Sequence, residues 1–327
     1  LGDVYKRQDR HSVNPMLLLA ALEYQAEWLS NDLPAEVTYP MGLLEEDSSG
    51  LYKQLSWAAN LLNWGFYGRA EGGVTSFLVG EEIPVTFGED ISYGTSGVQY
   101  YLAARDNVDY ESWLAASGPL GLFDTYSELF GDPFEREIEP LIPEDLSQPD
   151  FMLPWTGGET WYFTGGPHGG WNTGSAWAAL DFVPPNQEAG CSPSEHWTTA
   201  VAAGIVSRSG KGAVVLDLDG DGYSGTGWAV TYMHLADRDR AAVGTAVKTG
   251  DPLGLPGCEG GFTNGTHVHL ARTYNGRWIS ADGPLPFDLD GWISQGAGFE
   301  YNGTLVRDGA VKAADIFHTE NNAITAD

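Results

Sequence analysis

The stretch that decides the fold of the C-terminal half is short and reads Gly265-Thr266-His267-Val268-His269-Leu270. It falls in a predicted strand, His267–Thr273, in which residues i and i+2 point to the same face. His267 and His269 can therefore face one metal ion together. The pair alone is weak evidence, because the alternation of polar residues on a strand also produces it.

Short strands between glycine-rich turns surround this segment. The sequence Asp219-Gly220-Asp221-Gly222 gives a hairpin turn signal between two of them. Strands and helices do not alternate, which argues against a doubly wound parallel sheet. We expect an antiparallel β sandwich or open barrel over residues 151–327, including a C-terminal extension. The other clear predicted strands are Ala200–Ser207, Ala213–Leu218 and Trp228–His234.

Residues 9–130 show helical periodicity instead. Asn14 suits an N-cap and Pro15 suits the first turn of a helix. The acidic, proline-containing segment 131–150 is predicted to be an interdomain linker. The fold class is thus α+β, with an all-α N-terminal domain before the β-rich one. Further helices are predicted over Leu51–Tyr67, over Gly97–Arg105 and within Trp113–Phe130.

Residues 1–8 resemble a translated sequencing adapter, and we expect them to be an artefact. The natural N-terminus and any signal peptide would then be missing. The alternative is an ordinary flexible N-terminus. No run of about 18 apolar residues is found, so no transmembrane helix is expected.

The charge and composition of the chain argue against some classes of partner and fold. The 327 residues include 16 Lys and Arg against 45 Asp and Glu, a formal net charge of -29. Phosphate binding needs a surplus of basic residues, so a nucleic-acid partner is not expected. With 43 Gly and 12 Trp, the chain suits a loop-rich β protein with an aromatic-lined groove.

Three further segments carry residues that could bind a metal. His234 ends a predicted strand, and His168 lies in the glycine-rich stretch 165–170. Asp181 is flanked by apolar residues, where a carboxylate is costly to bury without a partner. A catalytic zinc takes three ligands from His, Asp or Glu, leaves one position for water, and lowers the pKa of that water.

These residues resemble the pattern of the lysostaphin-like metallopeptidases over roughly residues 150–285, most closely in the staphylolytic and β-lytic branch. The family carries a first His followed by an Asp, an isolated His after a tyrosine-containing strand, and a final His-x-His. The glycine-punctuated stretch 243–254 resembles the hairpin before the family's last motif. Ala271 stands where many members have an acidic residue. The ordered matches in this chain are His168, Asp181, His234 and His267-x-His269.

The resemblance implies His168, Asp181 and His269 as zinc ligands and His234 and His267 as catalytic histidines. It also implies an endopeptidase that cuts peptide cross-links of bacterial peptidoglycan, at small residues such as glycine. Such a protein is secreted or lies in the cell envelope. The oligomeric state stays open.

Two rival functions remain at this point. One is a non-catalytic cell-wall-binding or hydrolase-activating protein, since some family members have lost ligands, although all five positions are present here. The other is a zinc-binding adhesive or storage protein without hydrolysis. His196, His11 and His318 match nothing in the pattern, and His196 is expected at the surface.

Cys191 and Cys258 are the two cysteines of the chain. Two are too few for a disulfide scaffold or a cysteine-rich zinc site, but an exported protein can form a single disulfide. We predict that bond, which would tie together two loops of the candidate site. Two free buried thiols are the alternative.

The segment Asp217–Gly222 resembles the start of a calcium loop. The twelfth position of such a loop is Glu, whereas here it is Trp228. A polar hairpin turn is therefore the favoured interpretation.

The first predicted helix faintly resembles the catalytic helix of lytic transglycosylases. The position of their acidic Glu falls on Gln25, and an amide cannot act as a general acid. Glu23 would point elsewhere, since two residues span roughly 200° of a helix. We therefore expect residues 9–130 not to cleave glycan but to hold the wall substrate, or to serve as a structural cap.

Overall fold

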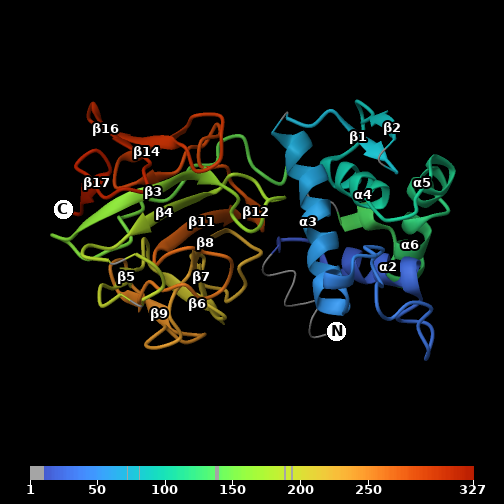
Figure 1. The fold of residues 1–327 in the computed structure, drawn as a ribbon, viewed down its shortest axis with the longest axis horizontal. Coiled ribbons are helices and arrows are strands. Elements are labelled where there is room, and N and C mark those ends of the chain that lie inside the picture. Colours follow the sequence, from blue (N-terminus) through green and yellow to red (C-terminus); the bar gives the residue numbers. More distant parts are fainter. Residues whose placement is uncertain (1–10, 72, 81, 137–139, 188, 193) are drawn as a thin grey trace. The chain divides into compact units, whose positions relative to one another are not determined.

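In a computed structural model, the chain is described from residue 11 to 327, except for residues 72, 81, 137–139, 188 and 193. It divides into two compact units (Figure 1). The first takes in the chain up to Glu139 together with Trp171–Ser175, and the second takes in Pro140–Gly170 and Ala176–Asp327. The segment predicted to be an artefact, residues 1–8, lies outside the described residues. None of the helices among these residues combines the length and the apolar character that a membrane span requires.

The first unit is mainly helical, as expected. Asn14 caps the first described helix, because its Oδ1 accepts the Met16 N–H at 2.9 Å, and Pro15 occupies the first turn. Gln25, on the same helix, accepts a hydrogen bond from the Arg105 guanidinium at 2.5 Å. The helices are α2 (Pro15–Ala26), α3 (Leu51–Ala70), α4 (Tyr93–Ala103), α5 (Tyr110–Ser117) and α6 (Leu122–Phe130), with 3-10 turns η1 (Glu46–Ser48) and η2 (Pro133–Arg136).

This unit also contains a small antiparallel hairpin that the sequence reasoning did not foresee in an all-α domain. Strand β1 (Ser76–Val79) pairs with β2 (Ile83–Thr86). Phe77 and Val79 are buried, and Phe77 packs against Phe87 and Trp113. Four-residue strands carry little sequence signal, and packing of their apolar side against helices stabilises them.

The second unit is built on one antiparallel sheet of nine strands within the described residues. Its order is β17-β3-β4-β11-β8-β7-β6-β9, with β12 paired to β11 (Figure 1). The strands are β3 (Thr160–His168), β4 (Ala179–Val183), β6 (Gly204–Gly210), β7 (Ala213–Asp217), β8 (Trp228–Met233), β9 (Ala246–Val247), β11 (Val268–Tyr274), β12 (Arg277–Trp278) and β17 (Ala323–Thr325).

Two smaller antiparallel sheets complete this unit. One pairs β5 (Thr198–Thr199) with β10 (Pro252–Gly254). The other contains β13 (Asp288–Leu289), β14 (Trp292–Gly296), β15 (Gly303–Arg307) and β16 (Ala310–Ala313), and β14 and β15 lie against β3. The antiparallel, α+β character of the chain is thus as predicted.

The core of the second unit explains why the central strands hold their positions. Strands β7 and β8 are buried along their whole length, so apolar residues fill most of their positions and do not alternate with exposed polar ones. Tyr232 on β8 is fully buried, and its hydroxyl accepts the Val201 N–H at 2.8 Å. Burial raises the pKa of that phenol, so it stays protonated.

The segment predicted to be a linker is divided between the units. The second unit begins at Pro140, so residues 140–150 belong to the β-rich part. Gln148 donates to the Asp288 carbonyl at 2.7 Å and accepts from the buried Arg272 guanidinium. Arg272 lies over the Phe287 ring at 4.7 Å, and burial lowers its pKa to about 9.

Cys191 and Cys258 form a disulfide in this structure, with their Cα atoms 5.6 Å apart. Cys191 lies in the loop after β4, next to Ser192, whose N–H donates to the buried Thr266 hydroxyl at 3.1 Å. Thr266 directly precedes His267, and Cys258 directly precedes Glu259, whose carbonyl contacts His234. The bond therefore joins the segments that precede or hold two of the candidate histidines.

Replacing both cysteines by serine should destabilise the second unit by about 4 kcal/mol, because the bond closes a loop with a sequence separation of 67 residues. Thermal unfolding should then shift down by about 10 °C. Reductant should produce a similar shift in the parent protein and none in the double variant. Thiol labelling of the unfolded, unreduced parent should find no free cysteine, and two labelled cysteines would contradict the bond.

Candidate metal centre

His168 and Asp181 meet because the pairing of β3 with β4 is irregular. Gly165 lies opposite Asp181 and His168 lies opposite Ala179, with register shifts on both sides of Gly165. Such bulges bend a strand and redirect its side chains. The missing side chain of Gly165 leaves room for the carboxylate, since a Cβ there would lie 2.7 Å from Asp181 Oδ2.

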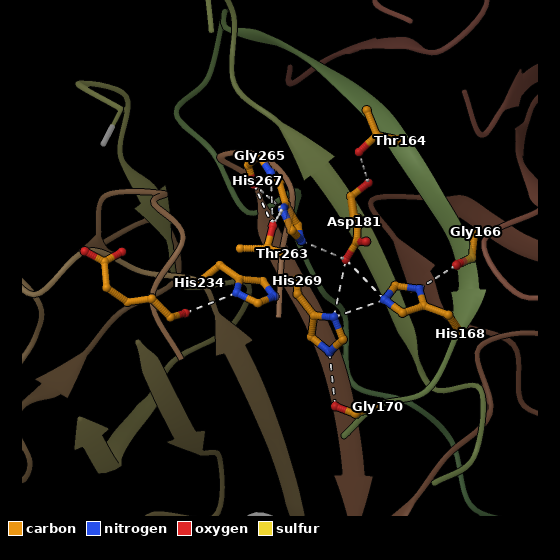
Figure 2. Close-up of polar contacts among 11 residues, drawn as sticks. Thr164, Gly166, His168, Gly170, Asp181, His234, Thr263, Gly265, His267 and His269 are labelled. Atoms are coloured by element: carbon orange, nitrogen blue, oxygen red, sulfur yellow. Dashed lines mark hydrogen bonds and ion pairs between the residues drawn. The ribbon is translucent and has the colours of Figure 1, made fainter. Parts of the chain in front are cut away.

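The pairing of β4 with β11 adds the third residue, because His269 lies directly opposite Asp181. His168 Nε2 lies 3.3 Å from Asp181 Oδ1 and 3.1 Å from His269 Nδ1, which in turn lies 3.3 Å from Asp181 Oδ1. All three residues are buried. Figure 2 shows the three side chains converging from separate strands.

Backbone carbonyls determine which ring nitrogens face this triangle. His168 Nδ1 lies 2.8 Å from the Gly166 carbonyl, and His269 Nε2 lies 3.1 Å from the Gly170 carbonyl (Figure 2). A carbonyl oxygen only accepts, so each of these nitrogens carries the proton. In the neutral rings, the lone pairs of His168 Nε2 and His269 Nδ1 therefore point at the Asp181 carboxylate oxygen.

This arrangement fits a zinc ion. The ligand atoms of tetrahedral zinc lie about 3.3 Å apart, given metal–ligand distances of about 2.0–2.2 Å, and the triangle has edges of that length. Asp181 Oδ1 is buried without a hydrogen-bond partner in the described chain, as expected for an atom that a cation would bind. Two imidazoles and a carboxylate form a donor set typical of catalytic zinc.

His267 and His234 lie beside the triangle. His267 Nε2 is 3.7 Å from Asp181 Oδ1, and its Nδ1 lies 2.9 Å from the Gly265 carbonyl. His234 Nδ1 lies 3.1 Å from the Glu259 carbonyl, and the centroids of the two rings are 4.5 Å apart. By the same tautomer argument, both neutral rings leave Nε2 without a proton.

Burial and charge set the protonation of the group. Burial raises the pKa of the Asp181 carboxyl, but the His168 and His267 rings outweigh it and hold the pKa well below its usual range. Burial, with the His267 and His269 rings nearby, lowers the pKa of His234 to about 3. Burial also lowers the pKa of His269, whereas Asp181 outweighs burial at His168 and raises that pKa. A charged Asp181 beside neutral His269 and His234 favours a cation.

Comparisons with known proteins agree with this geometry. Residues 4–143 match the family model described as the LasA N-terminal domain. Protease LasA of Pseudomonas aeruginosa strain PAO1 is 24% identical over 295 residues, which cover 84% of this chain and 66% of LasA. Protease LasA of strain UCBPP-PA14 is 25% identical, with the same coverage. The chain thus spans slightly less than two thirds of the length of these relatives. The similarity extends over both units of the chain, including the residues of the candidate centre.

The chain is similar to protease LasA and carries the histidine and aspartate pattern of the lysostaphin-like metallopeptidases.

Two solved peptidase structures are also similar to parts of this chain. The deep-sea M23 metalloprotease pseudoalterin is 26% identical, with a TM-score of 0.42, over 51% of this chain and 96% of that one. The catalytic domain of lysostaphin from Staphylococcus simulans is 23% identical, with a TM-score of 0.27, over 38% of this chain and 89% of that one.

One departure from the lysostaphin-like pattern has a structural explanation. Ala271, where many members have an acidic residue, is fully buried on β11 between Ala179 and Thr231. A methyl group has no atom that could bind a metal, so Ala271 adds no ligand to the candidate centre.

Tyr301 is a neighbour of the centre that sequence reasoning missed. Its ring stacks on His168 with centroids 4.3 Å apart and an interplanar angle of 22°. Tyr301 lies in the C-terminal extension, far from His168 in sequence, so no local signal could have identified it.

The three unassigned histidines lie elsewhere. His196, expected at the surface, is half-buried, and its Nδ1 is 3.0 Å from Glu159 Oε1. His318 stacks on Tyr162 with centroids 4.5 Å apart. His11 is fully buried in the first unit.

The close approach of Gly165 to Asp181 can be tested directly. Gly165→Ala should push the carboxylate out of the triangle and weaken zinc binding at least tenfold, while the protein stays folded. Gly210→Ala is the matched control, since a Cβ at that strand glycine would meet no atom within 4 Å. Zinc titration against a competing chelator measures both, and equal affinity in the two variants would exclude the steric role of Gly165.

Proposed function

We propose that this chain is a zinc-dependent endopeptidase that hydrolyses peptide cross-links of bacterial peptidoglycan. The observation that supports this most is the buried triangle of His168 Nε2, Asp181 Oδ1 and His269 Nδ1. Those three residues would hold the zinc ion. When bound, zinc polarises the scissile carbonyl and lowers the pKa of water.

The chain's own contribution to the reaction comes from two histidines. In the tautomers that the Glu259 and Gly265 carbonyls select, the Nε2 atoms of His234 and His267 carry lone pairs, so this pair of rings can accept a proton from the attacking water. A ring protonated in this way can donate a hydrogen bond to the oxyanion or return the proton to the leaving amine. Glu259 and Gly265 hold the rings through Nδ1, which keeps Nε2 available throughout.

Resemblance to the lysostaphin-like metallopeptidases, rather than the shape of the site, favours peptidoglycan as the substrate, with cleavage at small residues such as glycine. The relatives in P. aeruginosa are named as proteases, and lysostaphin is described as an antimicrobial peptidase. A disulfide between Cys191 and Cys258 supports a secreted or envelope location, because such bonds persist in oxidising compartments.

The ligand assignment predicts one zinc ion per chain. His168→Ala, Asp181→Ala and His269→Ala should each lose zinc on dialysis and lose turbidity clearing of wall preparations, because a three-ligand site tolerates no missing ligand. His196→Ala, a histidine outside the centre, should keep both properties. Stoichiometric zinc in the Asp181→Ala protein would refute the role of that carboxylate. A zinc-loaded parent that binds walls without clearing them would favour a non-catalytic protein.

The two catalytic histidines should behave differently from the ligands. His234→Ala and His267→Ala should retain one zinc per chain yet lose turnover by about a hundredfold or more, since proton transfer and oxyanion stabilisation each contribute that much. Release of new amino termini from a glycine peptide measures turnover, and metal analysis measures zinc. Full activity in either variant would remove that residue from the mechanism.

A further inference from the structure

The hairpin between β7 and β8 carries three aspartates at alternate positions. Asp217 ends β7, Asp219 and Asp221 follow in the turn, and Gly222 comes next. One carboxylate oxygen from each aspartate lies within 4.8 Å of the others. Exposed acidic groups often cluster without a ligand, so this proximity alone carries little weight.

Asp217 provides the independent observation. Its side chain is fully buried, although it is a carboxylate at the end of an apolar strand. Oδ2 accepts the Gly222 N–H at 2.7 Å, but Oδ1 has no hydrogen-bond partner in the described chain. A buried carboxylate oxygen without a donor or a cation is strongly unfavourable.

The surrounding charges have the same sign. Within the described residues, no ion pair reaches any of the three aspartates. Gly227 leaves room for the Asp219 carboxylate, since a Cβ at position 227 would lie 2.5 Å from Asp219 Oδ2.

We propose that these three aspartates bind one calcium ion. Calcium takes six to eight oxygen ligands in flexible geometry, and carboxylates with water can supply them. Magnesium demands a tighter octahedron, and zinc prefers nitrogen or sulfur. The missing Glu at the twelfth position removes a bidentate ligand, so the affinity falls in the weak range of about 10⁻⁵ to 10⁻³ M.

The role of this ion is structural. Asp217 lies opposite Ala229 at the start of β8, and His234 follows five residues later. Five strand residues span about 17 Å, so the calcium site and the metal centre lie towards opposite ends of β8. Calcium therefore holds the β7–β8 hairpin closed without entering the chemistry.

Calcium titration of the whole chain tests this. The protein is stripped of metal, given one equivalent of zinc, and titrated with calcium chloride by calorimetry. One site should appear, and calcium at about a hundred times its Kd should raise the unfolding temperature by about 5 °C or more. Asp181→Ala should keep this rise, which separates the hairpin from the metal centre.

Asp217→Asn should abolish the calcium-dependent rise without lowering the unfolding temperature of the calcium-free protein, because the amide removes an uncompensated buried charge. Asp221→Asn, an exposed change, should weaken calcium binding at least tenfold. The matched control is Asp251→Asn, since Asp251 also accepts a backbone N–H in a turn, from Lys248 at 2.7 Å. Absence of binding, an equal response to magnesium, or an unchanged response in both hairpin variants would overturn the proposal.

Discussion

The candidate metal centre depends on four hydrogen bonds from histidine rings to backbone carbonyls. Gly166, Gly170, Gly265 and Glu259 each accept from one nitrogen of a different histidine. Each bond fixes a tautomer and a ring orientation together. Two of the resulting lone pairs meet at Asp181, and two remain on the Nε2 atoms of the rings beside it. Because the acceptors are backbone atoms, the shape of the glycine-rich loops, rather than further side chains, determines the chemistry.

Strand pairing brings the histidines and Asp181 close together, and the backbone carbonyls then fix the orientation of the rings. His269 lies opposite Asp181 on one side and Met233 on the other, so β4, β11 and β8 place Asp181, His269 and the residue before His234 side by side across the sheet. The irregular register of β3 adds His168 from the outside. The Cys191–Cys258 bond then restrains the loops around His267 and His234, which lie just outside regular strands. Loops that hold catalytic groups are otherwise the most mobile part of a β protein.

The sequence predicted the elements with strong periodicity and could not predict contacts made by the backbone. The two-residue spacing of His267 and His269 indicated a shared face, but it could not say which ring lies in the triangle with His168 and Asp181. That distinction depends on β11 beginning at Val268 and on the carbonyls of Gly170 and Gly265. Tyr301 reaches His168 only through tertiary folding, and β1 and β2 are too short to show a period. The orphaned Asp217 oxygen is likewise invisible until burial is known.

Asp181 and Asp217 show two solutions to one electrostatic problem. Both are buried carboxylates in a chain with a formal net charge of -29, in which self-repulsion opposes compaction. Asp181 lies among imidazoles, which can carry a proton when no cation is bound, so its charge is partly balanced by the protein itself. Asp217 lies beside the Asp219 and Asp221 carboxylates and accepts one backbone N–H, and no cationic side chain pairs with it in the described chain. The nitrogen-rich environment suits zinc and the oxygen-only environment suits calcium, and the surplus of acidic residues favours divalent cations at both.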